Sequence, residues 1–361
     1  MKMRKIVCSF MISVLCFMTA ISGVSATSYD TSKINAAYSK VVEYYKNNNN
    51  LNNADKILAV ESLGLEAESN QFDTSSANLS STSLSKKIVT EVLLGIDPTE
   101  DKETLESQID ENGNVEGSWG ASSDVWTLYA LYVTSSEKAN LIANKLNDEL
   151  AASSVCGYEW GGTYYADYDT TGWVIEGLAV VNKEKYATTI NKAIDYIKNN
   201  TTMTTTGWVT ADNVDTQSQV LEGMFAYDTN ALLNDSYTVH PVDCLLNTQL
   251  SDGSFPSGYN AEYTTAEVAK TLGTYKNGSV FEKAKKAYDK MMNPEQPDNT
   301  KPAQPTDTKK DSQSTNKVET TNQKTTSVKT GDETNVVIFV SLSMVSGGLF
   351  LVLRKEYERV H

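Results

Sequence analysis

The sequence predicts an all-α domain made of helical hairpins that close into a ring, carried by a secreted chain of 361 residues. Three observations in residues 27–292 lead to this prediction: an internally repeated stretch, a regular alternation of helix-like segments, and recurrent glycine turns with an aromatic residue. The two ends of the chain differ in composition from this middle part and predict other kinds of segment.

The repeat is clearest between residues 169–179, which read DTTGWVIEGLA, and residues 215–225, which read DTQSQVLEGMF. Both stretches begin with Asp-Thr, and both place Glu and then Gly at the eighth and ninth positions. Such self-similarity is typical of repeat architectures. Asp169 and Asp215 are interpreted as helix caps, because an Asp side chain can accept hydrogen bonds from the free amides of a first turn.

Alignment on the Glu-Gly-Leu part of the repeat extends the series to six segments. The predicted inner helices are residues 53–65, 82–94, 122–132, 169–179, 215–225 and 263–273. The predicted outer helices between them are residues 32–46, 104–109, 137–150, 186–198, 239–250 and 280–292. This alternation favours a closed ring over an open solenoid, because a ring has no exposed end repeats. An irregular helical bundle with a chance similarity between two segments is the alternative.

One position of the alignment is polar in all six inner helices. The six residues are Glu61, Glu91, Tyr129, Glu176, Glu222 and Lys270. If this position faces the centre of the ring, the residues form a candidate site for a cation or a polar ligand. The alternative is that they are structural groups that are solvated or hydrogen-bonded to one another.

A turn with a Gln, a Gly and an aromatic residue precedes several of the predicted inner helices. Residues 246–255 place Gln249 before Asp252-Gly253-Ser254-Phe255, and residues 105–120 place Gln108 before a glycine turn with Trp119. These turns are expected to seat the aromatic ring between neighbouring hairpins. The pattern resembles the repeat of the prenyltransferase and squalene-cyclase superfamily. The resemblance implies an (α/α)6 toroid over most of residues 30–292, but a fold alone does not give a function.

Two catalytic motifs known from this superfamily are only partly present in the chain. Protein prenyltransferases hold zinc with Asp, Cys and His, and here Asp243-Cys244 has only the adjacent His240 in the body of the chain. No metal and no cofactor is therefore expected. Class II cyclases protonate their substrate with an Asp-x-Asp-Asp motif. Residues 167–170 supply only the first two acids of this motif, so a structural role for these aspartates is favoured over a catalytic one.

Charge and cysteine content exclude further classes. The net charge of −15 becomes −18 for residues 27–292, because the leader is basic and the tail is neutral, and such a charge disfavours nucleic acid as a partner. Only Cys156 and Cys244 lie beyond the leader, so the domain is not a disulfide scaffold. The sequence leaves open whether these two cysteines form one disulfide bridge or remain two thiols.

The first 26 residues predict a secretory signal peptide. Three basic residues precede an apolar run, and Val24-Ser25-Ala26 follows it, so cleavage is expected after Ala26. A first transmembrane helix is the weaker alternative, since the apolar run is short and ends in small residues.

The end of the chain predicts a wall anchor. Residues 336–353 carry no charge, are long enough for a transmembrane span, and are followed by Arg354 and Lys355. With the preceding Lys-Thr-Gly-Asp, residues 327–361 resemble a sortase sorting signal of Gram-positive bacteria, although Ser327-Val328 stands where the family has Leu-Pro. The resemblance implies that a sortase cleaves after Thr330, with Gly331 leaving, and joins Thr330 to the peptidoglycan cross-bridge. A plain membrane anchor is the alternative.

Residues 293–326, rich in Thr, Lys, Asn, Gln and Pro, predict a disordered stalk. Taken together, the sequence predicts a surface protein that binds a small molecule, a glycan or another protein. The alternative is an extracellular toroid enzyme that acts on a carbohydrate or terpenoid-type substrate with central carboxylates. The five tryptophans and 19 tyrosines are expected mainly in the core and between hairpins, with glycan stacking as the second use.

Overall fold

The computed structural model describes residues 29–68, 79–160, 162–200 and 214–294. The chain divides into two compact units, residues 1–298 and 299–361, and every described residue belongs to the first. The predicted leader, nearly all of the stalk and the sorting signal lie outside the described residues. Within the described residues, no helix has the length and apolar character needed to cross a membrane.

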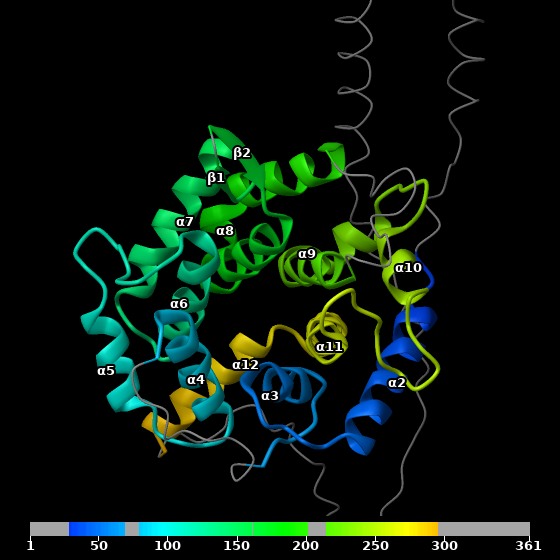
Figure 1. Cartoon of the computed structure of the whole chain (residues 1–361), viewed down its shortest axis with the longest axis horizontal. Helices are drawn as coiled ribbons and strands as arrows, with labels where there is room; N and C mark the ends of the chain where they lie inside the picture. Colours follow the sequence, from blue (N-terminus) through cyan, green and yellow to red (C-terminus); the bar gives the residue numbers. More distant parts are fainter. Residues whose placement is uncertain (1–28, 69–78, 161, 201–213, 295–361) are drawn as a thin grey trace, which may run out of the picture. The chain divides into compact units, whose positions relative to one another are not determined.

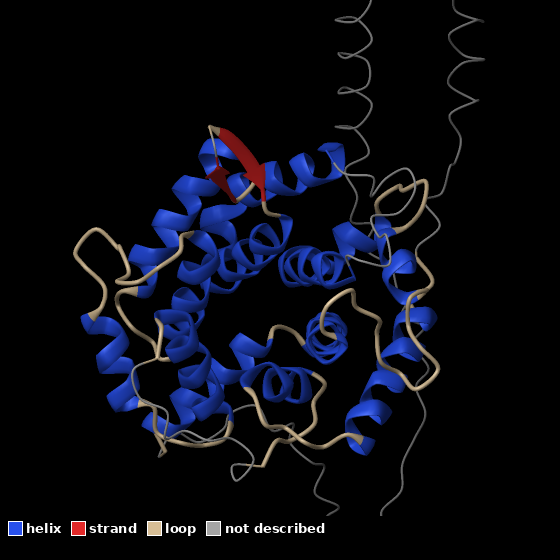
Figure 2. Cartoon of the chain, in the orientation of Figure 1, coloured by secondary structure: helices blue, strands red, loops and turns tan. Residues whose placement is uncertain are grey.

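The predicted all-α class is confirmed for these residues, which form helices and one short hairpin (Figure 1; Figure 2). The helices are α2 (Ser32–Asn47), α3 (Ala54–Ser62), α4 (Ser81–Leu93), α5 (Thr99–Ser107), α6 (Ala121–Val133), α7 (Ala139–Ser153), α8 (Tyr168–Asn200), α9 (Val214–Asn234), α10 (Pro241–Leu246), α11 (Ala261–Asn277) and α12 (Val280–Met292). The strands β1 (Gly157–Trp160) and β2 (Thr163–Ala166) pair antiparallel, with Gly157 opposite Ala166.

Six helices contact one another in a closed series, and we call them the ring helices. α3 contacts α4, α4 contacts α6, α6 contacts α8, α8 contacts α9, α9 contacts α11, and α11 contacts α3. They overlap the six segments predicted as inner helices, although α3 and α4 end before the predicted residues 65 and 94, and Figure 1 shows them around a common centre. α2, α5, α7 and α10 pack against them from outside.

Side chains cap the starts of several ring helices, as the sequence predicts. Asn53 Oδ1 accepts a hydrogen bond from Lys56 N at 3.0 Å at the start of α3. Asn260 Oδ1 accepts one from Tyr263 N at 3.1 Å at the start of α11. These bonds satisfy amides that have no partner within the helix, so they fix where each helix begins.

The cap assigned to Asp169 is wrong by two positions. Asp167 accepts hydrogen bonds from Thr170 N at 3.0 Å and Thr170 Oγ1 at 2.7 Å, and α8 begins at Tyr168. Asp169 therefore lies inside the first turn. Asp215 likewise lies in the first turn of α9, one residue after its start.

α8 and α9 each contain a break that divides them into two helices. The breaks are at Asn182, with φ −166° and ψ 90°, and at Asp228, with φ −156° and ψ 90°. Asn182 Oδ1 accepts from Lys185 N, and Asp228 Oδ1 accepts from Ala231 N, both at 2.9 Å, so each break is also a new cap. The repeat thus extends to these two residues, which have the same 46-residue spacing.

Glycines of the repeat lie where ring helices meet backbone to backbone. A Cβ on Gly223 of α9 would lie 2.3 Å from Gly172 O of α8. A Cβ on Gly172 would in turn lie 2.5 Å from Gln219 O of α9. No larger residue fits this contact without moving the helices apart. Gly177, the glycine of α8 equivalent to Gly223, lies against side chains of α6 instead, since a Cβ there would be 3.1 Å from Leu128 Cδ2.

The two aromatic turns have different outcomes. Before α11, Gln249 Nε2 donates to Ala37 O at 3.0 Å and to Gly253 O at 3.1 Å, and Phe255 is fully buried, as predicted. Before α6, the expected seat between hairpins is wrong, because Trp119 is 89% exposed. The tryptophan that is buried in this region is Trp126, which belongs to α6 itself.

Two helix boundaries also differ from the predictions. α5 begins earlier, because Asp97 Oδ1 accepts from Thr99 N at 3.0 Å and starts the helix there. α10 ends at Leu246, since the following turn uses a bond from Leu250 N to Ser254 O at 2.9 Å. The β1–β2 hairpin was not predicted, as four-residue strands are too short for a recognisable alternation.

α12 forms with the predicted bounds, but its predicted place outside the ring is wrong. It contacts α3, α4, α6 and α11, which lie on different sides of the ring. Phe281 stacks on Tyr129 of α6, with ring centroids 3.6 Å apart and an interplanar angle of 5°. The apolar face that includes Phe281, Ala284 and Tyr288 is buried there, so α12 covers one end of the ring helices.

Cys156 and Cys244 are not joined by a disulfide, which decides between the two states left open by the sequence. Cys156 is buried, and burial raises the pKa of its thiol.

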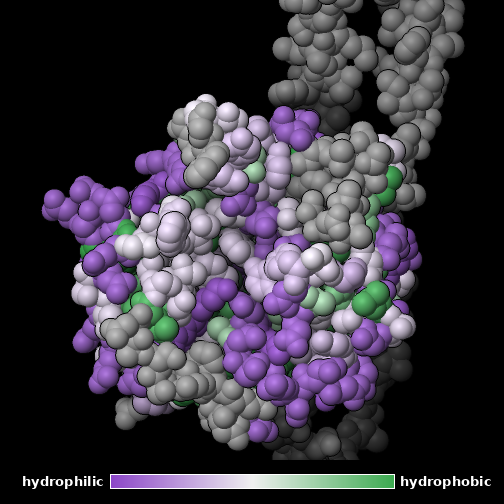
Figure 3. Space-filling model, in the orientation of Figure 1, coloured by the Kyte–Doolittle hydropathy of each residue, from purple (hydrophilic) through white to green (hydrophobic). Residues whose placement is uncertain are grey.

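On the face shown in Figure 3, hydrophilic and intermediate residues predominate, and hydrophobic ones form only small scattered patches.

Candidate functional site

The polar position aligned across the repeats is buried in every ring helix, with at most 5% of each residue exposed. The residues are Glu61, Glu91, Tyr129, Glu176, Glu222 and Lys270. Glu176 and Tyr129 contact the start of α12, so this position faces the end of the ring that α12 covers. The observed pairing fits structural groups bonded to one another more closely than solvated groups.

Four of these residues and Glu267 form what we call the buried polar cluster. Tyr129 donates to Glu176 Oε2 at 3.2 Å and to a backbone carbonyl of α8 at 2.7 Å. Lys270 Nζ lies 3.1 Å from Glu267 Oε2 and 3.7 Å from Glu222 Oε2. Glu222 and Glu267 therefore share one ammonium group in an interior closed to solvent, and the charge of Glu176 also acts on that group.

Hydroxyl and amide groups donate hydrogen bonds to some of the carboxyl oxygens in the cluster. Ser279 Oγ donates to Glu176 Oε1 at 2.7 Å, and Thr274 Oγ1 donates to Glu222 Oε1 at 3.4 Å. Gln219 Nε2 donates to Glu267 Oε2 at 3.1 Å. Glu222 Oε2 and Glu267 Oε1 are buried without a hydrogen-bond partner among the described residues.

Burial dominates the protonation of the cluster. It raises the pKa of Glu176 to about 6, against the opposing effects of the Ser279 hydroxyl and Lys270. It raises the pKa of Glu222 well above its ordinary value. For Lys270, burial acts to lower the pKa, but Glu222 and Glu267 outweigh it and raise the pKa. The cluster can therefore hold protons on its carboxyl groups while Lys270 stays charged.

Glu61 and Glu91 are held by ion pairs of their own. Glu61 Oε2 lies 2.7 Å from Lys283 Nζ of α12. Glu91 Oε1 lies 3.7 Å from Lys87 Nζ, which is 2.6 Å from Asp101 Oδ2. Burial, with Asp101 as the second cause, raises the pKa of Glu91 to about 8.

Glu267 was missed from the sequence although a signal for it was present. It lies one helical turn before Lys270, and the equivalent position of α9 is Gln219. In α6 and α8 the same position is Trp126 and Trp173, whose rings meet edge to face at 5.7 Å. A comparison three residues before the aligned position would have found this second layer.

The Asp-x-Asp stretch divides between two roles. Asp167 is the cap of α8, whereas burial raises the pKa of Asp169 to about 6. Asp215 of the next repeat adds to the rise in Asp169 and accepts from Tyr259 at 2.8 Å. Asp169 is therefore influenced by Asp167 of its own motif as well as by Asp215 of the next repeat.

The described part of the chain has no group of three or more His, Cys, Asp or Glu residues that could hold a metal ion. His240 Nδ1 accepts from Val242 N at 3.3 Å at the start of α10. Asp243 accepts from Tyr29 at 2.7 Å and from Lys33 at 3.0 Å. Both residues of the tested zinc motif therefore have structural partners.

A pocket of about 290 Å³ lies where the end of α2 meets the starts of α3 and α11. Its lining consists of Tyr44, Tyr45, residues 47–50, which are all asparagine, Lys56 and Glu262. We call it the rim pocket. None of these residues was predicted as a site, although two tyrosines followed by a run of asparagines are visible in the sequence.

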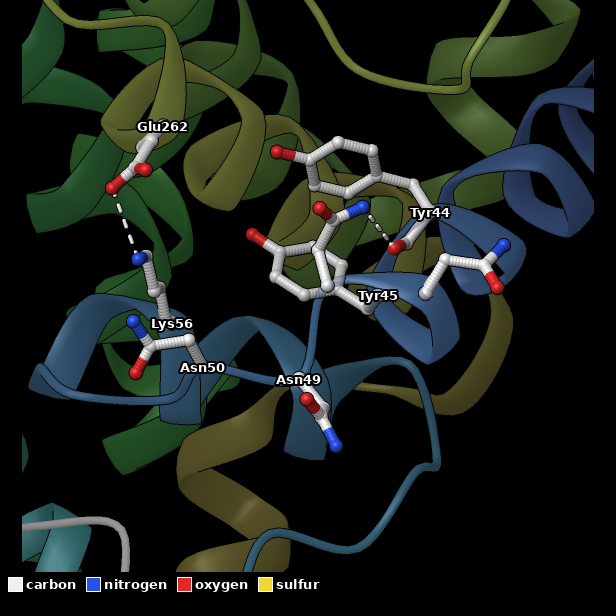
Figure 4. A pocket seen from close by; sticks show the side chains of 8 residues that line it. Tyr44, Tyr45, Asn49, Asn50, Lys56 and Glu262 are labelled. Atoms are coloured by element: carbon white, nitrogen blue, oxygen red, sulfur yellow. Dashed lines mark hydrogen bonds and ion pairs between the residues drawn. The ribbon is translucent and has the colours of Figure 1, made fainter.

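The rim pocket combines aromatic, amide and ion-paired groups. Figure 4 shows the phenolic ends of Tyr44 and Tyr45 directed toward the ion pair of Lys56 with Glu262, whose N–O distance is 2.9 Å. The two rings meet edge to face with centroids 5.2 Å apart. Asn48 Nδ2 donates to Tyr44 O at 2.8 Å, which holds the turn after α2 against the helix.

Comparison with protein-family models, with curated proteins and with solved structures gave no match to this chain.

Proposed function

We propose that this chain is an extracellular binding protein that a sortase attaches to the peptidoglycan cross-bridge, and that it displays an (α/α)6 toroid. The closed series of contacts among the six ring helices supports the toroid. The order of leader, domain, stalk and sorting signal in the sequence supports secretion and anchoring.

The observation that favours binding over catalysis by the predicted carboxylates is their burial. Glu61, Glu91, Glu176 and Glu222 each expose 5% or less, and α12 covers the end of the ring to which Glu176 belongs. A glycosidase needs two carboxyl groups that a substrate can reach. The rim pocket, by contrast, is hollow, and its lining residues other than the buried Tyr45 are partly or fully exposed.

The rim pocket fits a neutral saccharide. Each asparagine amide offers both donors and acceptors, which match sugar hydroxyls. Tyrosine rings provide an apolar face beside a polar hydroxyl, a combination suited to a sugar ring. The single ion pair, between Lys56 and Glu262, leaves the lining without net charge, which favours a neutral ligand over an ionic one.

The enzyme alternative rests on Asp169 instead. Its pKa of about 6 and its neighbour Asp215, which is bonded to Tyr259, provide an acid near the starts of α8 and α9. A general acid needs such a raised pKa. Turnover of a carbohydrate that is lost in Asp169→Asn would favour this alternative over binding.

The test is a glycan array probed with the full-length protein purified in mild detergent, followed by calorimetry on the glycans retained. We expect neutral glycans to bind, and Tyr44→Ala and Asn50→Ala each to weaken binding about ten-fold, roughly the effect of losing one stacking or amide contact. Trp119→Ala, which removes an 89% exposed ring outside the pocket, serves as the matched control and should leave the affinity unchanged. Binding that is insensitive to Tyr44→Ala would contradict the assignment of the rim pocket.

A further inference from the structure

A second pocket, of about 230 Å³, lies at the other end of α11 from the rim pocket. Glu262 of the rim pocket is in the first turn of α11, whereas Thr274 and Tyr275 of the second pocket are in its last turn. α8 contributes residues just before its break, α9 contributes residues on both sides of its break, and Ser279 and Glu282 are the N-cap and a first-turn residue of α12. We call it the acceptor pocket, for the reason given next.

The three aliphatic hydroxyls of this pocket direct their protons into the protein, and the lining also contains the phenolic hydroxyl of Tyr275. Thr229 Oγ1 donates to Phe225 O at 2.9 Å. Thr274 and Ser279 donate to the buried carboxyl groups of Glu222 and Glu176, and Ser279 Oγ also accepts from Phe281 N at 3.2 Å. A hydroxyl has one proton to donate and two lone pairs, so the aliphatic hydroxyls have only acceptor capacity left for a ligand, with one lone pair remaining on Ser279.

Glu282 adds negative charge to the same pocket. It lines the pocket, is exposed, and forms no ion pair among the described residues. The first halves of α8 and α9 and the whole of α11 end here, while α12 and the second halves of α8 and α9 begin here, so the partial charges of the helix ends offset one another. No Lys, Arg or His belongs to the described lining.

The interior behind the pocket is short of hydrogen-bond donors. Glu222 and Glu267 of the buried polar cluster share the single ammonium group of Lys270. Glu222 Oε2 has no hydrogen-bond partner among the described residues, although Glu222 is fully buried. Thr274 links this carboxyl group directly to the pocket wall.

We propose that the acceptor pocket binds an alkyl-chain primary ammonium group, a ligand separate from that of the rim pocket. The ammonium group donates three hydrogen bonds, which match the Thr274, Ser279 and Glu282 acceptors. The alkyl part packs against Phe225 and Tyr275, whose ring centroids are 5.3 Å apart. A free alkylamine and a lysine side chain carry the same ammonium group, and either one fits the chemistry of the residues that line the pocket.

The experiment measures binding of n-butylammonium to the full-length protein by calorimetry, with n-butanol as the neutral analogue of equal size. We expect the amine to bind at least ten-fold more tightly than the alcohol, because only the amine supplies charge and three donors. An acetyl-lysine-amide with a free side-chain amine distinguishes the sources. If it binds like butylammonium the pocket accepts lysine side chains, and if it does not the pocket takes small free amines.

Two variants test the location. Glu282→Gln removes an exposed charge from the pocket and should weaken amine binding about three- to ten-fold, in the range expected for one partly solvated charge pair. Ala226→Phe fills the pocket and should abolish binding. Glu103→Gln, an equal change at an exposed residue of α5, is the matched control and should bind as the parent does.

Amine and alcohol binding of equal strength would overturn the proposal, as would amine binding unaffected by both pocket variants. Thermal unfolding of each variant shows that the fold is retained, and Glu282→Gln keeps the test valid even if Ala226→Phe fails to fold. Loss of glycan binding in Tyr44→Ala leaves this proposal untouched, because the two pockets share no residue.

Discussion

At Glu176, burial and hydrogen bonding act in opposite directions on one carboxyl group. Burial favours the neutral form, whereas the hydroxyls of Ser279 and Tyr129 and the charge of Lys270 favour the carboxylate. Burial prevails, since the pKa of about 6 stays above the ordinary 4.5. A proton that the folded chain binds more tightly than the unfolded chain makes stability depend on pH.

We expect the stability contributed by protonated Glu176 to be fully present below pH 4.5 and to be lost as the pH rises through about 6. The loss is about 2 kcal/mol, since one pKa unit corresponds to roughly 1.4 kcal/mol. Glu176→Gln, which imitates the protonated group, should abolish this part of the dependence in urea unfolding between pH 4.5 and 7.5.

The quantity to follow is the difference between the parent and the variant. His240, whose pKa burial lowers from 6.5, acts in the opposite direction over part of the same range and cancels in that difference. Glu103→Gln, at an exposed position, should keep the pH dependence of the parent. A parent and a Glu176→Gln variant with parallel pH curves would refute the argument.

The sequence predicted that Glu176 belongs to an aligned polar position but not which groups it meets. Its partners Tyr129 and Ser279 are 47 and 103 residues away along the chain. Such contacts depend on how the ring closes and on the path of α12, and neither follows from local periodicity. Glu267 differs in this respect, because its place one turn before Lys270 was visible in the sequence.

Among the elements, the contact of α8 with α9 depends on two glycines. Gly172 and Gly223 allow the two backbones to touch, so the pair forms the most extensive helix contact of the described residues. The two breaks after this contact recur at the same repeat position. The repeat is therefore a packing unit that includes its own helix end.

Gly223→Ala places a methyl group 2.3 Å from Gly172 O, well inside van der Waals contact. The helices must separate, so we expect the variant to lose about 1–3 kcal/mol of unfolding free energy despite the better helix propensity of Ala. Denaturant unfolding measures the loss.

Lys192→Ala is the control for this change. Lys192 is exposed on α8, and substitution there should alter the free energy of unfolding by less than about 0.5 kcal/mol. Equal stability of Gly223→Ala and the parent would mean that the two helices meet less closely than described.

Helix existence was predicted well because apolar residues recur with helical spacing in every ring helix. Boundaries failed where a local turn or cap decided them, as at the Asp97 turn before α5 and the Asp167 cap of α8. The place of α12 failed for another reason: its apolar face predicts burial but does not identify the surface that it meets.

At the scale of the whole chain, the segments predicted on either side of the domain determine where it acts. The leader with Ala26 and the sorting signal with Thr330 and Gly331 lie outside the described residues, and their roles stay predictions. They are testable without any structural information.

Thr330→Ala removes the residue whose carbonyl the sortase is predicted to transfer. We expect more than about nine-tenths of the protein to move from the muramidase-released wall fraction to the membrane or the medium, because covalent transfer needs that acyl donor. Immunoblots of the fractions measure the shift. Thr326→Ala, four residues earlier, is the control, and unchanged wall attachment of the Thr330 variant would exclude sortase anchoring.

The contact of α3 with α11 also determines the order in which the domain can fold. These helices begin at Ala54 and Ala261, so the contact that closes the series of ring helices joins parts of the chain separated by about two hundred residues. Contacts of such sequence separation form late, because a long loop must be closed before they stabilise the fold. A chain emerging N-terminus first cannot complete the domain until α11 and α12 have followed. For a chain exported as the predicted leader implies, folding would thereby be deferred to the far side of the membrane.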